Sequence, residues 1–163
     1  MNGPLSQALQ SVGIRVCHHP VLVTAPPPSW KAFDAAWHQR QQVDWVGFTS
    51  QRAVRGFSQR LATLGGSLAE LSHCEIACIG PSTAEAWVAL GGQPPLVPKV
   101  FHAEALGEVM LRTAITAGHC CWLPQALQAR EFLGILLREA GIKVLETPTY
   151  QILPAPSAAS RAW

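Results

Sequence analysis

The stretch that decides the fold of this chain reads Asp44-Trp45-Val46-Gly47-Phe48-Thr49-Ser50-Gln51-Arg52-Ala53-Val54. It opens on a carboxylate, continues as a short apolar run and breaks at two hydroxyl residues, directly before a helical pattern. This order predicts a buried strand whose carboxyl end turns through Thr49 and Ser50 into a helix. In open α/β sheets, ligands bind at that end of the strands. Asp44 stands at the opposite end of the strand, where we expect a structural role.

A second unit of the same kind lies at residues 75–85. An apolar run up to Ile79-Gly80 is followed by Pro81-Ser82-Thr83-Ala84, which again predicts a strand, a turn of small residues and a helix start. Since the carboxyl ends of parallel strands meet at one edge of a sheet, we expect the two hydroxyl-bearing turns to lie close together.

The remaining chain alternates strand-like runs with helical patterns that end at glycines. Helices are expected at residues 4–12, at 29–41 with Ser29 as the cap, from Ala53 to a stop at Gly65, from Ala86 to a stop at Gly91, at 101–117 and at 127–140. Strands are expected at residues 14–17, 21–24, 120–123 and 142–147, with at most a very short one at 94–98. The alternation predicts an α/β fold: an open parallel, flavodoxin-like sheet with helices on both faces and right-handed crossovers.

Length and composition set the broad class of the protein. The 163 residues suffice for one domain, or one domain and a fragment, and 48% hydrophobic against 13% charged residues favours an ordered core. No apolar run is long enough for a membrane span, and the first ten residues lack the pattern of a signal peptide. We therefore expect a soluble, cytoplasmic protein.

The charged residues favour an acidic ligand over a nucleic acid. A net charge of +2 without any dense Lys/Arg run argues against binding to nucleic acid. Nine of the twelve basic residues are arginines, whose planar guanidinium group binds carboxylates with two hydrogen bonds. This composition permits a polycarboxylate ligand.

The five cysteines are odd in number, and we interpret them as buried thiols of a reducing compartment rather than disulfides or metal ligands. The cluster Cys17-His18-His19 invites a metal interpretation, but no third and fourth ligand follows at a suitable spacing. We therefore expect loop histidines and no bound metal.

Five segments together resemble the uroporphyrinogen-III synthase family. They are Asp44 to Val54 (the D-x-V-x-F-T-S-x-x-A-V pattern), Ile79 to Ala84 (I/V-G-x-x-T-A), Ala103 to Leu106, Arg130 to Leu133, and Gly141 to Tyr150 with its closing tyrosine. Each segment is short and made of common residues. Their order and spacing carry the resemblance.

The resemblance implies a division of the chain. Members of this family have two similar α/β domains joined by a two-stranded linker, and one domain is inserted within the other. By this likeness, residues 29–149 are the complete inserted domain. Residues 1–28 are a remnant of the split domain with a linker strand, and residues 150–163 are the second linker strand and a disordered tail. Residues 21–25 should pair antiparallel with residues 150–154.

The resemblance also implies a reaction: cyclisation of hydroxymethylbilane to uroporphyrinogen III, in tetrapyrrole and heme biosynthesis, with inversion of ring D, loss of water and no cofactor. Hydroxymethylbilane synthase, which supplies this substrate, is a candidate partner. Tyr150 is the expected proton donor or water positioner. The expected substrate contacts are the side chains of Ser50 and Thr83, the turn backbone at Thr49 and Ser82, and the guanidinium group of Arg130.

Other interpretations of these residues and of the chain remain open. Ser50, Ser82 and Thr83 are typical helix caps, Tyr150 could fill the linker, and Arg130 could be a solvated helix residue. A phosphate- or nucleotide-binding module of flavodoxin type is a second function class, although a Gly-rich loop, a Lys-Ser/Thr pair and an acidic metal set are lacking. A third is a truncated, catalytically inactive family member, because the counterpart of about half the split domain is missing.

Overall fold

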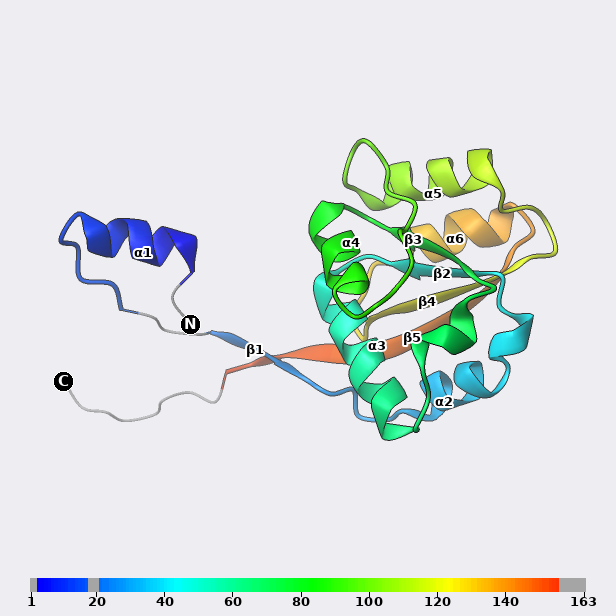
Figure 1. Cartoon of the computed structure of the whole chain (residues 1–163), viewed down its shortest axis with the longest axis horizontal. Helices are drawn as coiled ribbons and strands as arrows, with labels where there is room; N and C mark the ends of the chain where they lie inside the picture. Colours follow the sequence, from blue (N-terminus) through cyan, green and yellow to red (C-terminus); the bar gives the residue numbers. More distant parts are fainter. Residues whose placement is uncertain (1–2, 18–20, 156–163) are drawn as a thin grey trace. The chain divides into compact units, whose positions relative to one another are not determined.

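The computed structural model describes residues 3–17 and 21–155 and divides the chain into two compact units. The larger unit runs from Thr24 to Ile152, and the smaller one contains the two flanking ends of the chain. In the smaller unit, α1 (Pro4–Ser11) confirms the predicted first helix. The larger unit holds nearly all of the remaining elements (Figure 1).

A five-stranded sheet in the order β1-β5-β4-β2-β3 forms the centre of the fold. Its strands are β1 (Leu22–Ala25), β2 (Trp45–Phe48), β3 (Glu75–Cys78), β4 (Cys120–Ala126) and β5 (Lys143–Pro154). The pairs β2/β3, β2/β4 and β4/β5 are all parallel. These strands confirm the predicted α/β class with a mostly parallel sheet.

The predicted pairing of residues 21–25 with residues 150–154 is also confirmed, since β1 is the neighbour of β5. Ala155 N donates to Val21 O at 2.9 Å, and Gln151 Nε2 donates to Pro26 O at 2.8 Å. The later residue of one segment thus lies beside the earlier residue of the other, which is the antiparallel order.

Helices cover both faces of the parallel strands, as Figure 1 shows for α5 and α6 on one side and α2 and α3 on the other. Their bounds are α2 (Lys31–His38), α3 (Gln51–Thr63), α4 (Pro81–Val88), α5 (Ala103–Thr113) and α6 (Phe132–Glu139), with two 3-10 helices at Arg40–Gln42 and Leu68–Leu71. Within β2, Val46 and Phe48 join the core cluster under α2, α3 and α4. Trp45 joins the cluster under α5 and α6. Alternation across a fully buried strand explains why its sequence is apolar throughout.

Asp44 has the structural role expected of it. Its carboxylate Oδ2 accepts a hydrogen bond from Cys120 N at 2.7 Å, and its backbone bonds to Cys120 O and Glu75 N, both at 2.9 Å. One residue therefore ties together the starts of β2, β3 and β4. The short strand expected near residue 96 is reduced to a single parallel bridge between Leu96 and Ala77.

Several predicted elements were wrong in extent or kind. Residues 14–17 form no strand in the described part of the chain, where no neighbouring strand supplies hydrogen-bond partners. Ser29 does not cap α2; the cap position is Trp30, and the Ser29 hydroxyl accepts from Lys31 N at 3.3 Å. The helix predicted at 101–117 is shorter, because the ring of His102 caps its start and the chain leaves the helix after Thr113.

The helix predicted at 127–140 begins only at Phe132 because β4 continues through Ala126. Pro124 looks like a strand stop in the sequence, since proline cannot donate to a ladder. In the structure β4 pairs with β2 only at Cys121 and Trp122, so Pro124 lies beyond that ladder and needs no donor towards β2. Arg130 consequently lies in the loop between β4 and α6, not within a helix.

Four cysteines are buried free thiols as predicted, namely Cys74, Cys78, Cys120 and Cys121, whereas Cys17 is exposed and contradicts the prediction. His18 and His19, and the tail from residue 156, lie outside the described residues. Among the residues that are described, no group of three or more His, Cys, Asp or Glu side chains could hold a metal ion. None of the helices seen there is long and apolar enough to cross a bilayer.

Candidate functional site at the carboxyl edge of the sheet

A bulge in β5 sets the position of Tyr150. The register with β4 shifts between Gln125 and Ala126, so that Gln125 faces Pro148 while Ala126 faces Tyr150, which leaves Thr149 as the extra residue. Both Thr149 and Tyr150 are buried as a result. Tyr150 joins the core cluster under α3, and the Thr149 hydroxyl donates to Gln125 O at 3.2 Å. Bulges often redirect side chains beside active sites in this way.

The Tyr150 hydroxyl reaches the start of α3. It lies 3.2 Å from Ser50 Oγ, and the same Ser50 oxygen accepts a hydrogen bond from Ala53 N at 3.1 Å. Ser50 is therefore the helix cap that its residue type allowed, and it contacts Tyr150 as well. Either hydroxyl could be the donor in this contact. We consider the arrangement in which Ser50 donates to the Tyr150 oxygen while its own oxygen accepts from Ala53 N. The Tyr150 proton is then free to point at a ligand.

Tyr150 lines two cavities. The first, which we call the Arg130 cavity, has a volume of about 420 Å³ and is lined by Thr49, Ser50, His102, Glu104, Arg130 and Tyr150, among others. The second, the Arg55 cavity, measures about 310 Å³, and its lining includes Trp30, Arg52, Arg55, Gln59, Thr149 and Tyr150. Both volumes fall in the range of small-molecule sites, of order 300 to 1,000 Å³.

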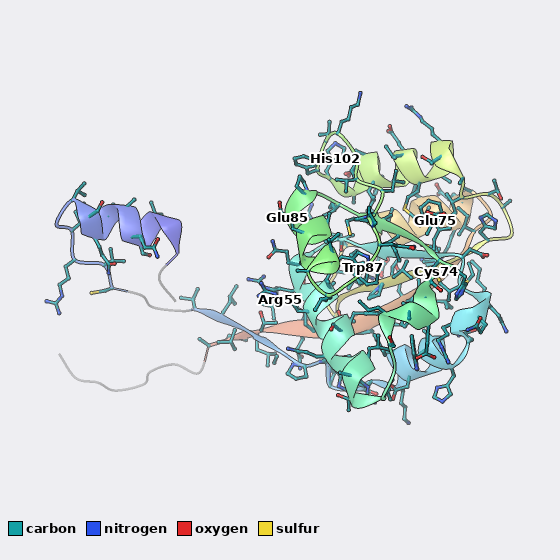
Figure 2. All side chains as sticks on the ribbon, in the orientation of Figure 1. Arg55, Cys74, Glu75, Glu85, Trp87 and His102 are labelled. Carbon is teal, nitrogen blue, oxygen red and sulfur yellow. The ribbon has the colours of Figure 1, made fainter. Side chains whose placement is uncertain are left out.

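The arginines around these cavities differ in their ion pairing from those elsewhere in the larger unit. Four arginines away from Tyr150 form ion pairs, namely Arg40 with Glu70, Arg60 with Asp34, Arg112 with Glu108 and Arg138 with Glu146. Arg52, Arg55 and Arg130 form no such pair within the described part of the chain, and all three are exposed. Figure 2 labels Arg55 on the same ribbon. The guanidinium groups left without carboxylate partners are those nearest Tyr150.

The start of α5 adds an imidazole and a carboxylate to the Arg130 cavity, and His102 is labelled there in Figure 2. His102 Nδ1 accepts from Ala105 N at 3.1 Å and lies 2.9 Å from Glu104 Oε2. The pKa of Glu104 is lowered, first by a hydrogen bond from its own backbone N–H, then by His102 and by the charge of Arg130. Glu104 is thus an anion at neutral pH on a wall of this cavity.

The structure brings together four of the six residues proposed from the sequence: Thr49, Ser50, Arg130 and Tyr150. The second turn does follow the neighbouring strand, because β3 pairs with β2 through Phe48 and Cys78. Ser82 is exposed and Thr83 buried, and neither lines the Arg130 cavity. Neither caps α4, whose cap position is Gly80, so the capping alternative for these two residues was wrong.

Sequence reasoning missed Arg52, Arg55, His102 and Glu104. Arg52 and Arg55 stand directly behind the Thr49-Ser50 turn, so their place on the first turns of the helix was a usable signal. Their position on the tyrosine side depends on the packing of α3 against β5, which no local pattern reveals. The sequence did not indicate His102 as a helix cap, because histidine is uncommon at that position.

Comparison with known proteins decides the family. The sequence profile of the family described as uroporphyrinogen-III synthase HemD matches residues 3–163. The chain belongs to the uroporphyrinogen-III synthase family. The resemblance inferred from its motifs is thereby confirmed.

A uroporphyrinogen-III synthase from Synechococcus elongatus is 32% identical over 151 residues, which cover 92% of this chain and 56% of that protein. The crystal structure of a mutant uroporphyrinogen III synthase from Thermus thermophilus has a TM-score of 0.71 at 23% identity, over 92% of this chain and 58% of that one. A second Thermus thermophilus structure gives 0.62 at 24% identity, over 92% and 59%. The structural matches support the fold, and this chain spans just over half the length of these relatives.

Proposed function

We propose that this chain performs the reaction of its family, in which hydroxymethylbilane is cyclised to uroporphyrinogen III with inversion of ring D and loss of water. The observation that carries this proposal is the contact of 3.2 Å between Ser50 Oγ and Tyr150 Oη at the border of two cavities. The three guanidinium groups around that contact, which form no ion pair with any described residue, suit a substrate rich in acetate and propionate groups.

In the proposed mechanism Tyr150 helps the hydroxyl group of the substrate to leave. The phenol donates its proton to the departing oxygen, while the electron-rich pyrrole expels that oxygen as water. Ser50 donates to the Tyr150 oxygen and so stabilises the negative charge that forms there. Proton transfer by a positioned side chain typically contributes about 100-fold to 10,000-fold. The pyrrole supplies the electrons, so the proposed mechanism uses no cofactor.

The remaining residues position a flexible ligand. Arg130 binds carboxylates, and the first turns of α3 behind Thr49 and of α4 around Ser82 offer backbone N–H groups and the positive end of the helix dipole. Thr83 is proposed to contribute a hydroxyl contact at the second turn. Holding the two ends of a flexible tetrapyrrole together lowers the entropic part of the barrier.

The substrate is made by another enzyme, hydroxymethylbilane synthase, and we propose that the two act in sequence in the cytoplasm. Because the chain spans just over half the length of its relatives, a catalytically inactive family member is the competing possibility. A product assay separates the two.

The test is a single-turnover conversion of hydroxymethylbilane, scored as the type III product against the type I ring that forms spontaneously. We expect Tyr150→Phe to lower the rate of type III formation about 100-fold or more. Loss of one neutral hydrogen bond in Thr83→Ala should cost about tenfold or less. Arg112→Gln, whose ion pair with Glu108 lies on α5, serves as the control.

Two results would contradict the proposal in different ways. If the unaltered chain yields only the type I ring at the spontaneous rate, the chain alone is inactive. If the chain yields the type III product and Tyr150→Phe keeps the full rate and selectivity, the proton-donor role is wrong and catalysis rests on orientation alone.

A further inference from the structure

The Arg55 cavity contains two cationic side chains and no acidic one among its lining residues. The charge comes from a single stripe of α3, on which Arg52, Arg55 and Gln59 follow one another at helical spacing. Two like charges three residues apart on a helix repel each other, so this arrangement does not stabilise α3. It does place two planar guanidinium groups, each with five N–H donors, at one cavity.

The cavity is also lined by Trp30 and Pro26, which contacts within the protein hold in place. Trp30 packs edge-to-face on Phe33, with ring centroids 5.6 Å apart. The Arg60 guanidinium lies 5.2 Å from the Trp30 ring centroid and is itself fixed by two hydrogen bonds to Asp34. The carbonyl of Pro26 accepts a hydrogen bond from Gln151. The indole surface of this cavity is therefore preorganised.

Gly56 and Thr149, which also line the cavity, lie in close contact with each other. A Cβ atom built at Gly56 would lie 2.4 Å from Thr149 O, so α3 touches the backbone of β5 at this point. Gly56 stands next to Arg55 in the same stripe, and Thr149 is the bulged residue before Tyr150. The close approach consequently sets the position of the α3 backbone at Arg52 and Arg55 relative to Tyr150.

We propose that the Arg55 cavity is a subsite for one pyrrole ring that carries carboxylate side chains. Arg52 and Arg55 bind its acetate and propionate groups, and Trp30 provides the apolar surface for the ring. A volume of about 310 Å³ suits one substituted pyrrole ring. The inference rests on the proposed function, and it deepens that function by placing rings on both sides of Tyr150, one in each cavity.

The subsite can be tested by binding of uroporphyrin I, a stable tetrapyrrole with eight carboxylates, monitored by its fluorescence. The double variant Arg52→Gln/Arg55→Gln is expected to bind about 100-fold more weakly, about tenfold for each charge-assisted contact. Arg112→Gln, which removes an exposed arginine of α5, should bind as the unaltered chain does. Equal urea midpoints for the variants and the unaltered chain verify that the fold is retained.

Each outcome points to one conclusion. If the double variant binds like the unaltered chain while Arg130→Gln binds weakly, the subsite is wrong and the proposed function stands. If uroporphyrin I does not bind to the unaltered chain, both are overturned. Displacement of uroporphyrin I by inorganic phosphate, at concentrations at which chloride has no effect, would assign the cavity to a phosphate group and overturn the subsite.

Discussion

At the scale of single residues, the Ser50 hydroxyl serves two parts of the structure that are 100 residues apart in the sequence. Its oxygen caps α3 through Ala53 N and also meets the Tyr150 hydroxyl. Capping a helix is a structural role that many serines have. The additional contact with a buried phenol is a particular feature of this serine. The same atom therefore couples the stability of α3 to the orientation of Tyr150.

Replacing Ser50 should separate the two effects. Ser50→Ala removes the cap and is expected to lower the free energy of unfolding by about 0.5 to 2 kcal/mol. Ser50→Thr retains a hydroxyl and should recover most of this loss. Urea unfolding measures both variants, and an unchanged midpoint for Ser50→Ala would show that the cap contributes nothing. Recovery of stability without recovery of type III formation in Ser50→Thr would assign the contact with Tyr150 to catalysis.

At the scale of elements, the packing of α3 on β5 depends on the absence of a side chain. Helix interiors favour alanine over glycine by about 0.5 to 1 kcal/mol, yet both α3 and α5 contain a buried glycine. Next to Gly56 the obstacle is the Thr149 backbone oxygen, whereas next to Gly107 it is the end of the Leu136 side chain, 2.4 Å from a built Cβ. A side chain can rotate away, and a strand backbone cannot.

The two glycines should therefore differ in how well they tolerate substitution by alanine. Gly56→Ala should destabilise the protein by about 1 to 3 kcal/mol, because α3 must move off β5. Gly107→Ala should be milder, since Leu136 can adopt another rotamer and the helix gains propensity. The measurement is urea unfolding of both variants side by side. Equal losses would mean that the contact between Gly56 and Thr149 is not a special constraint.

The sequence predicts those elements whose local pattern agrees with their surroundings. The run before Thr49 is apolar, short and followed by a capped helix, and β2 and α3 form as expected. The full length of β4 was missed, since the tolerance of Pro124 in a strand depends on which neighbour β4 pairs with, a non-local fact. The candidate site shows the same division between local and non-local information. Ser50 and Tyr150 could be proposed from motifs in the sequence. The position of Arg55 beside Tyr150 could not be predicted, because it depends on how α3 packs against β5.

At the scale of the whole molecule, two core clusters lie on opposite faces of one sheet, and every member of both lies between Thr24 and Ile152. Four neutral thiols belong to these clusters. Burial raises the pKa of Cys74 and of Cys78 to about 12, from an ordinary value of 9.0. Burial also raises the pKa of Cys120 and of Cys121. The folded state therefore keeps these protons at a pH where the unfolded chain loses them.

This difference predicts alkaline destabilisation. A thiol whose pKa is raised by folding contributes its full stabilisation below pH 9 and loses it as pH rises towards 12. Each such thiol contributes up to about 1.4 kcal/mol per pH unit to the slope of the unfolding free energy. Cys78→Ala should reduce the slope between pH 9 and 11. Cys17→Ser, which removes an exposed thiol, should leave the slope unchanged, and equal slopes for all three proteins would refute the burial argument.

Tyr150 is the sole tyrosine in the sequence, against six tryptophans. Incorporation of fluorotyrosine would therefore place one fluorine nucleus in the protein, at the border of the two cavities and beside the Ser50 oxygen. Its NMR spectrum should show a single resonance that reports on this position without assignment. Ligands that enter either cavity would shift that resonance, so this chain offers a direct spectroscopic view of its own candidate site.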